Sequence, residues 1–172
     1  MTGNNLFDSC RMFKHACAFR DCAHFCEKEP WDVEHRMPSH TVSGIVNSAF
    51  ACEIFIKSLL IYHGFKIDEI KGHELKKLWR KLKEKDVELT DSVEKKMEEV
   101  FCSNGDFSFS DLLDNISNAF DYWRYIYEKS GGTIYINFLR IFRDLLRNVC
   151  CEELYKLTWT EYTKGKYDGK IR

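Results

Sequence analysis

An acidic and a basic side chain stand four residues apart in the most apolar segment of the chain. Glu53 and Lys57 lie in the run SGIVNSAFACEIFIKSLLIY. On a helix this spacing puts both on one face, and an unpaired charge inside a core would be costly. Two interpretations stay open. Either the two residues pair with each other or extend to the edge of a helical bundle, or they belong to a functional polar pocket that holds further polar partners.

A strongly basic segment follows. Residues 71–85 contain seven Lys or Arg against two Glu, and they include His73 and Trp79. Positive charge beside an aromatic ring can hold phosphates and stack a base. The alternative is a solvated helix face with Trp79 anchored in the core. Over the whole chain 26 Lys and Arg nearly balance 27 Asp and Glu, so only a local patch would attract nucleic acid.

The run FDYWRYIYE, residues 120–128, is unusually aromatic and contains Arg124. Aromatic faces can hold a guanidinium flat through cation–π contact. The simpler expectation, which we favour, is a packed aromatic core in which Arg124 pairs with a carboxylate.

Cysteine and histidine gather near the N-terminus. Zinc prefers such ligands, which here are Cys10, His15, Cys17, Cys22, His24 and Cys26. Zinc knuckles sit on turns, however, and this stretch has no Gly or Pro and is typical of continuous helix. We therefore expect these cysteines to be buried residues of a helix rather than zinc ligands. We expect no metal and no cofactor. Charged residues within the first 14 positions argue against a signal peptide, and the chain predicts a cytoplasmic protein that does not enter a membrane.

These side chains must be positioned by helices. With only 2 Pro and 9 Gly in 172 residues, the chain favours a few long helices, so the predicted fold class is all-α. We expect one domain over 1–172, in which an N-terminal helix within 1–30 packs on a core of about 40–157 and a frayed tail covers 160–172. Segment 42–62 is apolar on nearly every face and predicts the central helix.

Shorter and longer helices surround this centre in the prediction. The charged segments 73–84 and 91–101 predict short peripheral helices, and 110–129 predicts one further helix. A long last helix over 134–157 is expected to bury Phe138, Ile141, Phe142, Leu145, Leu146 and Val149. Its other face carries a polar stripe of Arg140, Asp144, Arg147, Asn148 and Cys151, as any surface helix does.

Several of these stretches together resemble bacterial proteins of the HEPN superfamily, the higher eukaryotes and prokaryotes nucleotide-binding domains. They are IVNSAFACEIFIKSLLIYHGF, KGHELKKLWRKL, FDYWRYIYEK and the RN pair of the last helix, within about residues 42–152. The most specific parts are the pattern Ala49, Glu53, Lys57 and the Gly-His-Glu-Leu segment at 72–75. The resemblance implies a HEPN-like up-and-down helical bundle with extra short peripheral helices, usually a homodimer, often a ribonuclease, a toxin or an antiphage accessory domain.

One departure from the family pattern concerns catalysis. Active members carry, on the last helix, an Arg followed after four to six residues by a His, and two such motifs meet across the dimer to cut RNA. Here Arg147 and Asn148 match, and no His follows at that spacing. An imidazole exchanges protons readily near neutral pH, whereas a Glu must first have its pKa raised. The resemblance therefore favours a domain that lacks the usual nuclease centre.

Three functions remain as hypotheses. The favoured one is a non-catalytic module of a bacterial defence or toxin–antitoxin system that binds RNA, a nucleotide or a cognate protein. Its predicted groove is formed by Glu53, Lys57, His73, Arg124, Arg147 and Asn148. The second is a metal-independent ribonuclease in which His73 supplies the imidazole and Arg124 or Arg147 steadies the phosphate. The third is a purely structural homodimerisation protein.

Overall fold

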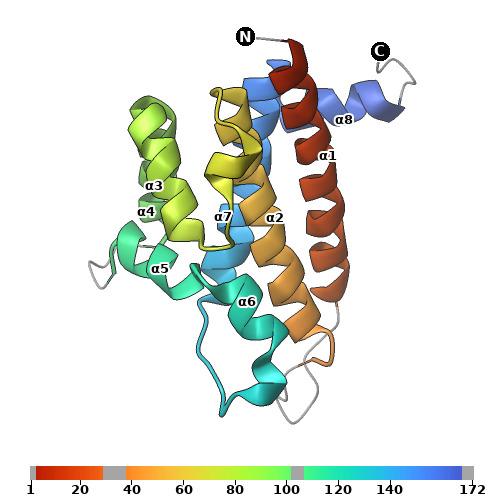
Figure 1. The fold of residues 1–172 in the computed structure, drawn as a ribbon. Helices are drawn as coiled ribbons and strands as arrows, with labels where there is room; N and C mark the ends of the chain where they lie inside the picture. The colour runs from red at the N-terminus through yellow and green to blue at the C-terminus, as the bar shows by residue number, and fades with distance from the viewer. Residues whose placement is uncertain (1–2, 29–37, 102–106, 168–172) are drawn as a thin grey trace.

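The computed structural model describes residues 3–28, 38–101 and 107–167, and these form helices joined by turns and short irregular links, with no strand among them (Figure 1). The predicted all-α fold class is confirmed. The α-helices are α1 (Gly3–Cys26), α2 (Thr41–Tyr62), α3 (Leu75–Lys85), α4 (Val87–Phe101), α5 (Phe109–Ile116), α6 (Ala119–Arg124), α7 (Ile136–Tyr155) and α8 (Trp159–Tyr167). Two short 3-10 helices, η1 (Ile67–Ile70) and η2 (Ile126–Glu128), join them.

Helix α2 is the centre of the bundle, as its all-round apolar sequence predicts. It lies between α1 and α7, and α3 and α6 also pack on it (Figure 1). Its length and composition would suffice to cross a membrane, but 72% of its most apolar stretch is buried inside the protein. That degree of burial is typical of the core helix of a soluble protein.

Helices α3, α4 and α5 form a peripheral layer beside this core (Figure 1). Helix α3 turns Leu75, Leu78, Trp79 and Leu82 inward and leaves its charges outside. Helix α4 begins at Val87, four residues before the predicted start. The reason is a cap, because the carboxylate of Asp86 accepts a hydrogen bond from the backbone N–H of Leu89 at 3.0 Å.

The single helix predicted over 110–129 is instead divided into α5, α6 and η2. The break falls at Ser117, whose carbonyl accepts from Leu75 N–H at 3.0 Å and whose hydroxyl accepts from Lys76 N–H at 2.9 Å. Both donors belong to the first turn of α3, where N–H groups have no partner within the helix. Ser117 therefore caps α3 rather than continuing its own helix.

The tail expected to be frayed over 160–172 forms helix α8 up to Tyr167, and residues 168–172 lie outside the described residues. Thr158 and Glu161 make a capping box, in which the Glu161 carboxylate accepts from Thr158 N–H at 2.8 Å. Tyr162 then packs edge-on against Phe13, with ring centroids 5.7 Å apart. Aromatic burial and the cap explain why this segment is ordered.

Helix α7 buries most of the face predicted, with Leu145 and Val149 partly buried against the core. Phe138, Phe142 and Leu146 are buried as expected, but Ile141 is 41% exposed. Arg143, at 1% exposure, occupies the interior instead. Its guanidinium donates to Glu27 and to the hydroxyl of Ser48, which compensates for the loss of water.

Candidate functional site

Glu53 is the buried centre of the candidate site. Its side chain is 2% exposed, and its two carboxylate oxygens bind two different cationic or polar partners. Oε1 accepts from Nζ of Lys57 at 2.7 Å, one helical turn along α2. Oε2 lies 2.9 Å from Nδ1 of His73, which is 20 residues away in sequence. The pairing interpretation is therefore correct for Lys57, and His73 is the further polar partner that a functional pocket requires.

His73 is held in a defined orientation. The contact occupies Nδ1 of the imidazole and leaves Nε2 for another partner. The preceding Gly72 has φ +99°, a left-handed conformation that favours glycine, and this turn brings the imidazole over α2 just before α3 begins. The His73 side chain is 44% exposed, so its imidazole is accessible from outside while the contact with Glu53 holds it in position.

Arg124 reaches the same site through an aromatic ring. The Phe120 ring lies 5.0 Å from the His73 imidazole and stacks on Phe50 at 4.7 Å. The Arg124 guanidinium lies over both Phe120, at 4.7 Å, and Tyr125, at 4.6 Å, and it also pairs with Asp121 at 3.1 Å. Arg124 therefore makes both the cation–π contact of the first interpretation and the carboxylate pair of the second, but the packed aromatic core of the second interpretation is not found. The aromatic run is not a packed core, because only its Trp123 is buried while Tyr122, Tyr125 and Tyr127 are exposed. We call Glu53, Lys57, His73, Phe120 and Arg124 the His73 site.

Two hollows meet at His73 and Lys71. One, the apolar hollow, has a volume of about 580 Å³ and is lined by Met12, His15, Phe19, Phe50, Glu53, Ile54, Lys57, Ile67, Ile70, Lys71 and His73. The other, the basic hollow, has a volume of about 360 Å³ and is lined by Lys71, Gly72, His73, Glu74, Lys77, Leu78, Lys81, Asn118 and Asp121. An apolar cavity beside a few convergent polar groups is the usual form of a ligand site.

Arg147 and Asn148 lie elsewhere on the bundle. The Arg147 guanidinium stacks over Trp159 of α8 at 4.4 Å, and its Nη2 donates to the Asn148 side chain at 3.0 Å. Burial, together with the positive charge of Arg20, lowers the pKa of Arg147. Within the described part of the chain, no hydrogen bond, ion pair or ring contact joins these two residues to the His73 site. Of the six residues predicted to form one groove, Glu53, Lys57 and His73 line the hollows and Arg124 is linked to them through the Phe120 ring, whereas Arg147 and Asn148 lie apart.

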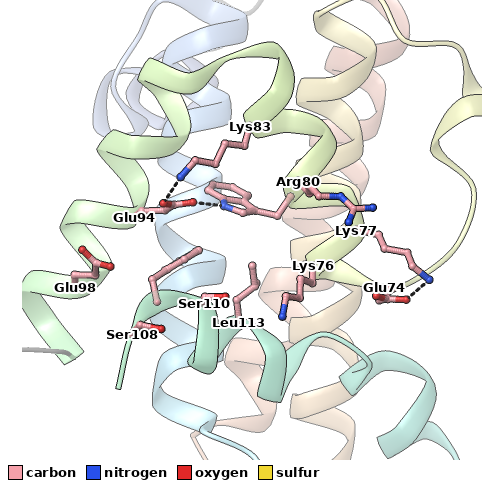
Figure 2. A pocket seen from close by; sticks show the side chains of 12 residues that line it. Glu74, Lys76, Lys77, Arg80, Lys83, Glu94, Glu98, Ser108, Ser110 and Leu113 are labelled. Carbon is pink, nitrogen blue, oxygen red and sulfur yellow. Dashed lines mark hydrogen bonds and ion pairs between the residues drawn. The ribbon is translucent and has the colours of Figure 1, made fainter. Parts of the chain in front are cut away.

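Trp79, considered above as a stacking platform for a base, is a core anchor. It is 3% exposed and packs edge-on against Phe142 at 5.4 Å. Its indole N–H donates to the Glu94 carboxylate at 2.8 Å (Figure 2). The basic segment keeps its exposed lysines, but the Trp79 ring is packed among core rings and cannot stack a base; only a small part of it borders a hollow between α3, α4 and α5.

The N-terminal cysteines and histidines lie along one continuous helix, α1. In residues 3–28, 38–101 and 107–167, no three His, Cys, Asp or Glu side chains come together as a metal site. His15 and Phe19 instead face the apolar hollow. Their spacing with Met12, at intervals of three and four, is a helix-face pattern that identifies this lining in the sequence.

An ionic network that the sequence did not reveal ties α1 to α7. Arg143 Nη1 donates to Glu27 at 2.6 Å, and its Nε donates to Asp144 at 3.2 Å. Asp144 also accepts from Arg20 Nε at 2.9 Å. Burial alone would raise the pKa of Asp144, but the hydrogen bonds from Arg20 and Arg143 outweigh it and the pKa lies below its ordinary value. This network stabilises the scaffold and contacts no hollow at His73.

No protein-family model matches the chain, and no curated protein or solved structure shows significant similarity to it. The class that fold and site define is an all-α helical bundle with an oriented imidazole and a stacked guanidinium on its surface.

Proposed function

We propose that this protein is a recognition domain that binds RNA or a nucleotide at the His73 site without cutting it. The observation that carries the proposal is the pairing of His73 with buried Glu53, beside an Arg124 that shares the Phe120 ring. A guanidinium and an imidazole both donate to phosphate oxygens. Aromatic rings beside them suit a base, since every base offers a flat face.

The basic hollow supplies the charge that such a ligand needs. Among the described residues, Lys71 pairs with exposed Asp68 at 2.8 Å and Lys77, itself 66% exposed, pairs with half-buried Glu74 at 2.6 Å. Exposed pairs of this kind contribute about 0–1 kcal/mol, so a phosphate competes for these lysines at little cost. The apolar hollow on the other side of His73 has room for a base.

The biological setting in this proposal rests on the HEPN resemblance. It comprises a cytoplasmic module of a bacterial defence or toxin–antitoxin system, working as a homodimer and with a cognate protein partner. Arg147, the only arginine of the family motif that matches, stacks on Trp159 and not on the His73 site. This separation supports binding over the family's usual cleavage.

A metal-independent ribonuclease is the second candidate. The observation in its favour is the same 2.9 Å contact, because a carboxylate that fixes one imidazole nitrogen leaves the other to move a proton. Arg124 would then stabilise the phosphate charge in the transition state.

The test is incubation of the pure protein with a mixed pool of labelled RNA in the presence of a chelator. The proposal predicts RNA retained intact on a filter, with retention that falls as salt rises because phosphate contacts release counterions. Cleavage that is lost in His73→Ala would establish the ribonuclease instead. If the RNA is neither retained nor cleaved, both the recognition domain and the ribonuclease are refuted, and the structural homodimer remains.

A further inference from the structure

A third hollow lies between α3, α4 and α5, and the function proposed above does not use it (Figure 2). Its volume is about 410 Å³, within the range of ligand sites. Its floor is apolar, formed by the small accessible parts of Trp79, Phe109 and Leu113, which are 3%, 4% and 3% exposed. We call it the Trp79 hollow. It adjoins the basic hollow through Glu74 and Lys77, but His73 does not line it.

The floor of the Trp79 hollow is rigid. The Trp79 ring packs against Phe109 at 5.8 Å, and its N–H is fixed by Glu94. Glu94 is fully engaged, because its other oxygen accepts from Lys83 Nζ at 2.6 Å. The hollow therefore offers a preformed apolar surface rather than one that must first be arranged.

The rim carries opposite charges on different helices. Figure 2 shows Lys76, Lys77 and Arg80 on the α3 side, and Glu94 and Glu98 on the α4 side. Most of these charges are already paired: Lys76 with Asp114 at 2.8 Å, Lys77 with Glu74 and Lys83 with Glu94.

Two rim charges stand apart from these pairs. Within the described ranges, exposed Arg80 and Glu98 make no hydrogen bond or ion pair, and they lie on opposite sides of the hollow (Figure 2). The unused charges of the rim are thus one cation and one anion, separated by an apolar floor.

We propose that the Trp79 hollow binds an extended peptide segment of a partner protein, with an acidic residue, an apolar residue and a basic residue in succession. The acidic side chain binds the Arg80 guanidinium, whose planar fork fits a carboxylate. The basic side chain binds Glu98, and the apolar side chain covers Trp79 and Leu113. A nucleic acid fits poorly, because the carboxylates of the α4 side repel phosphate.

The probe is a set of blocked five-residue peptides, titrated into labelled protein and followed by NMR at the indole N–H of Trp79. The mixed peptide is Glu-Gly-Leu-Gly-Lys. Its companions carry Glu at both ends, Lys at both ends, or Gly in place of Leu. We expect the mixed peptide to bind tightest and each companion to bind about fivefold more weakly, the loss of one surface ion pair or one apolar contact.

Charge-reversal variants test the assignment of each end. Arg80→Glu is expected to shift the preference to the peptide with two lysines, and Glu98→Lys to the peptide with two glutamates. Lys95→Glu is the matched control, since exposed Lys95 of α4 does not line the hollow. Equal affinities for all peptides, no binding of any peptide, or preferences unchanged by the two variants would each overturn the proposal. So would an indole shift produced by RNA and not by the mixed peptide, which would assign the hollow to nucleic acid.

Discussion

His73 Nδ1 lies 2.9 Å from a Glu53 oxygen, joining a half-exposed imidazole to a carboxylate that is 2% exposed. Lys57 shares the same carboxylate and neutralises it inside the core. A buried charge survives only with partners, so these residues depend on one another. The contact occupies Nδ1 of His73, so in the proposed function Nε2 is the nitrogen that meets a ligand.

Glu53→Gln tests this dependence. The amide keeps the size of the side chain but loses the charge, and it offers His73 and Lys57 only one acceptor oxygen. We expect RNA affinity to fall by roughly three- to tenfold, because the imidazole is no longer held. The measurement is a filter-binding titration. Glu88→Gln, at an exposed residue in the first turn of α4 that lines neither hollow at His73, is the control. An unchanged affinity in Glu53→Gln would show that the contact does not orient a ligand group.

Arg124→Gln removes the stacked guanidinium while leaving Phe120 and His73 in place. Cation–π contact at an exposed site contributes about 0.5–1 kcal/mol, so stability should change little. RNA affinity should fall by about fivefold, since a charge-assisted phosphate contact is lost. Lys129→Gln is the control, because Lys129 lies near Tyr122 and not near Phe120. Equal losses in both variants would indicate only a general loss of positive charge.

Arg143→Ala should destabilise the fold strongly. The guanidinium is 1% exposed, and its removal leaves a cavity and strips Glu27 and Ser48 of a donor. We expect the free energy of unfolding to fall by about 3 kcal/mol in urea denaturation. Arg140→Ala, at a side chain that is 35% exposed and paired with the same Glu27, should cost about 1 kcal/mol or less. Similar losses would contradict the burial of Arg143.

Asp144 should make the free energy of unfolding fall as the pH is lowered. Its pKa is lowered in the folded protein, since hydrogen bonds from Arg20 and Arg143 outweigh burial. Such a group stabilises fully above its unfolded pKa of about 4, and the contribution is lost as pH falls through the folded pKa. Urea unfolding from pH 7 to 3 should therefore decline less steeply in Asp144→Asn than in the natural chain. Parallel curves would rule out this linkage.

The cysteines should differ sharply in reactivity. Burial raises the pKa of Cys150 and Cys52 well above the ordinary value, and burial raises the pKa of Cys151 to about 11. Thiolates are the reactive form, so iodoacetamide at pH 8 should label exposed Cys22 long before these three. Peptide mapping by mass spectrometry measures the order. Rapid labelling of Cys150 in the folded protein would contradict its burial.

Local sequence patterns predicted the features that are set by residues close together in the chain. The all-round apolar composition of 42–62 identified the central helix, and the spacing of Glu53 and Lys57 anticipated their contact. The position of His73 depends instead on how η1 and α3 pack on α2, which no local pattern records.

Arg143 and Arg147 of α7 also make contacts with distant parts of the chain that local sequence patterns could not predict. Hydrophobic periodicity cannot identify a buried arginine whose partners, Glu27 and Ser48, lie on other parts of the chain. Arg147 was assigned to the groove by resemblance, but its guanidinium stacks on Trp159 of α8 and lies near enough to Arg20 of α1 for that charge to act on it.

The most direct test compares His73→Ala with Arg147→Ala in RNA affinity, measured on one labelled pool at fixed salt with a chelator present. The two residues are equivalent in the family-based prediction, but only His73 contacts Glu53 and Phe120. Circular dichroism first confirms that both variants stay folded. The proposed function predicts an affinity reduced by about tenfold in His73→Ala and unchanged in Arg147→Ala. Loss of affinity in Arg147→Ala with His73→Ala unaffected would contradict it.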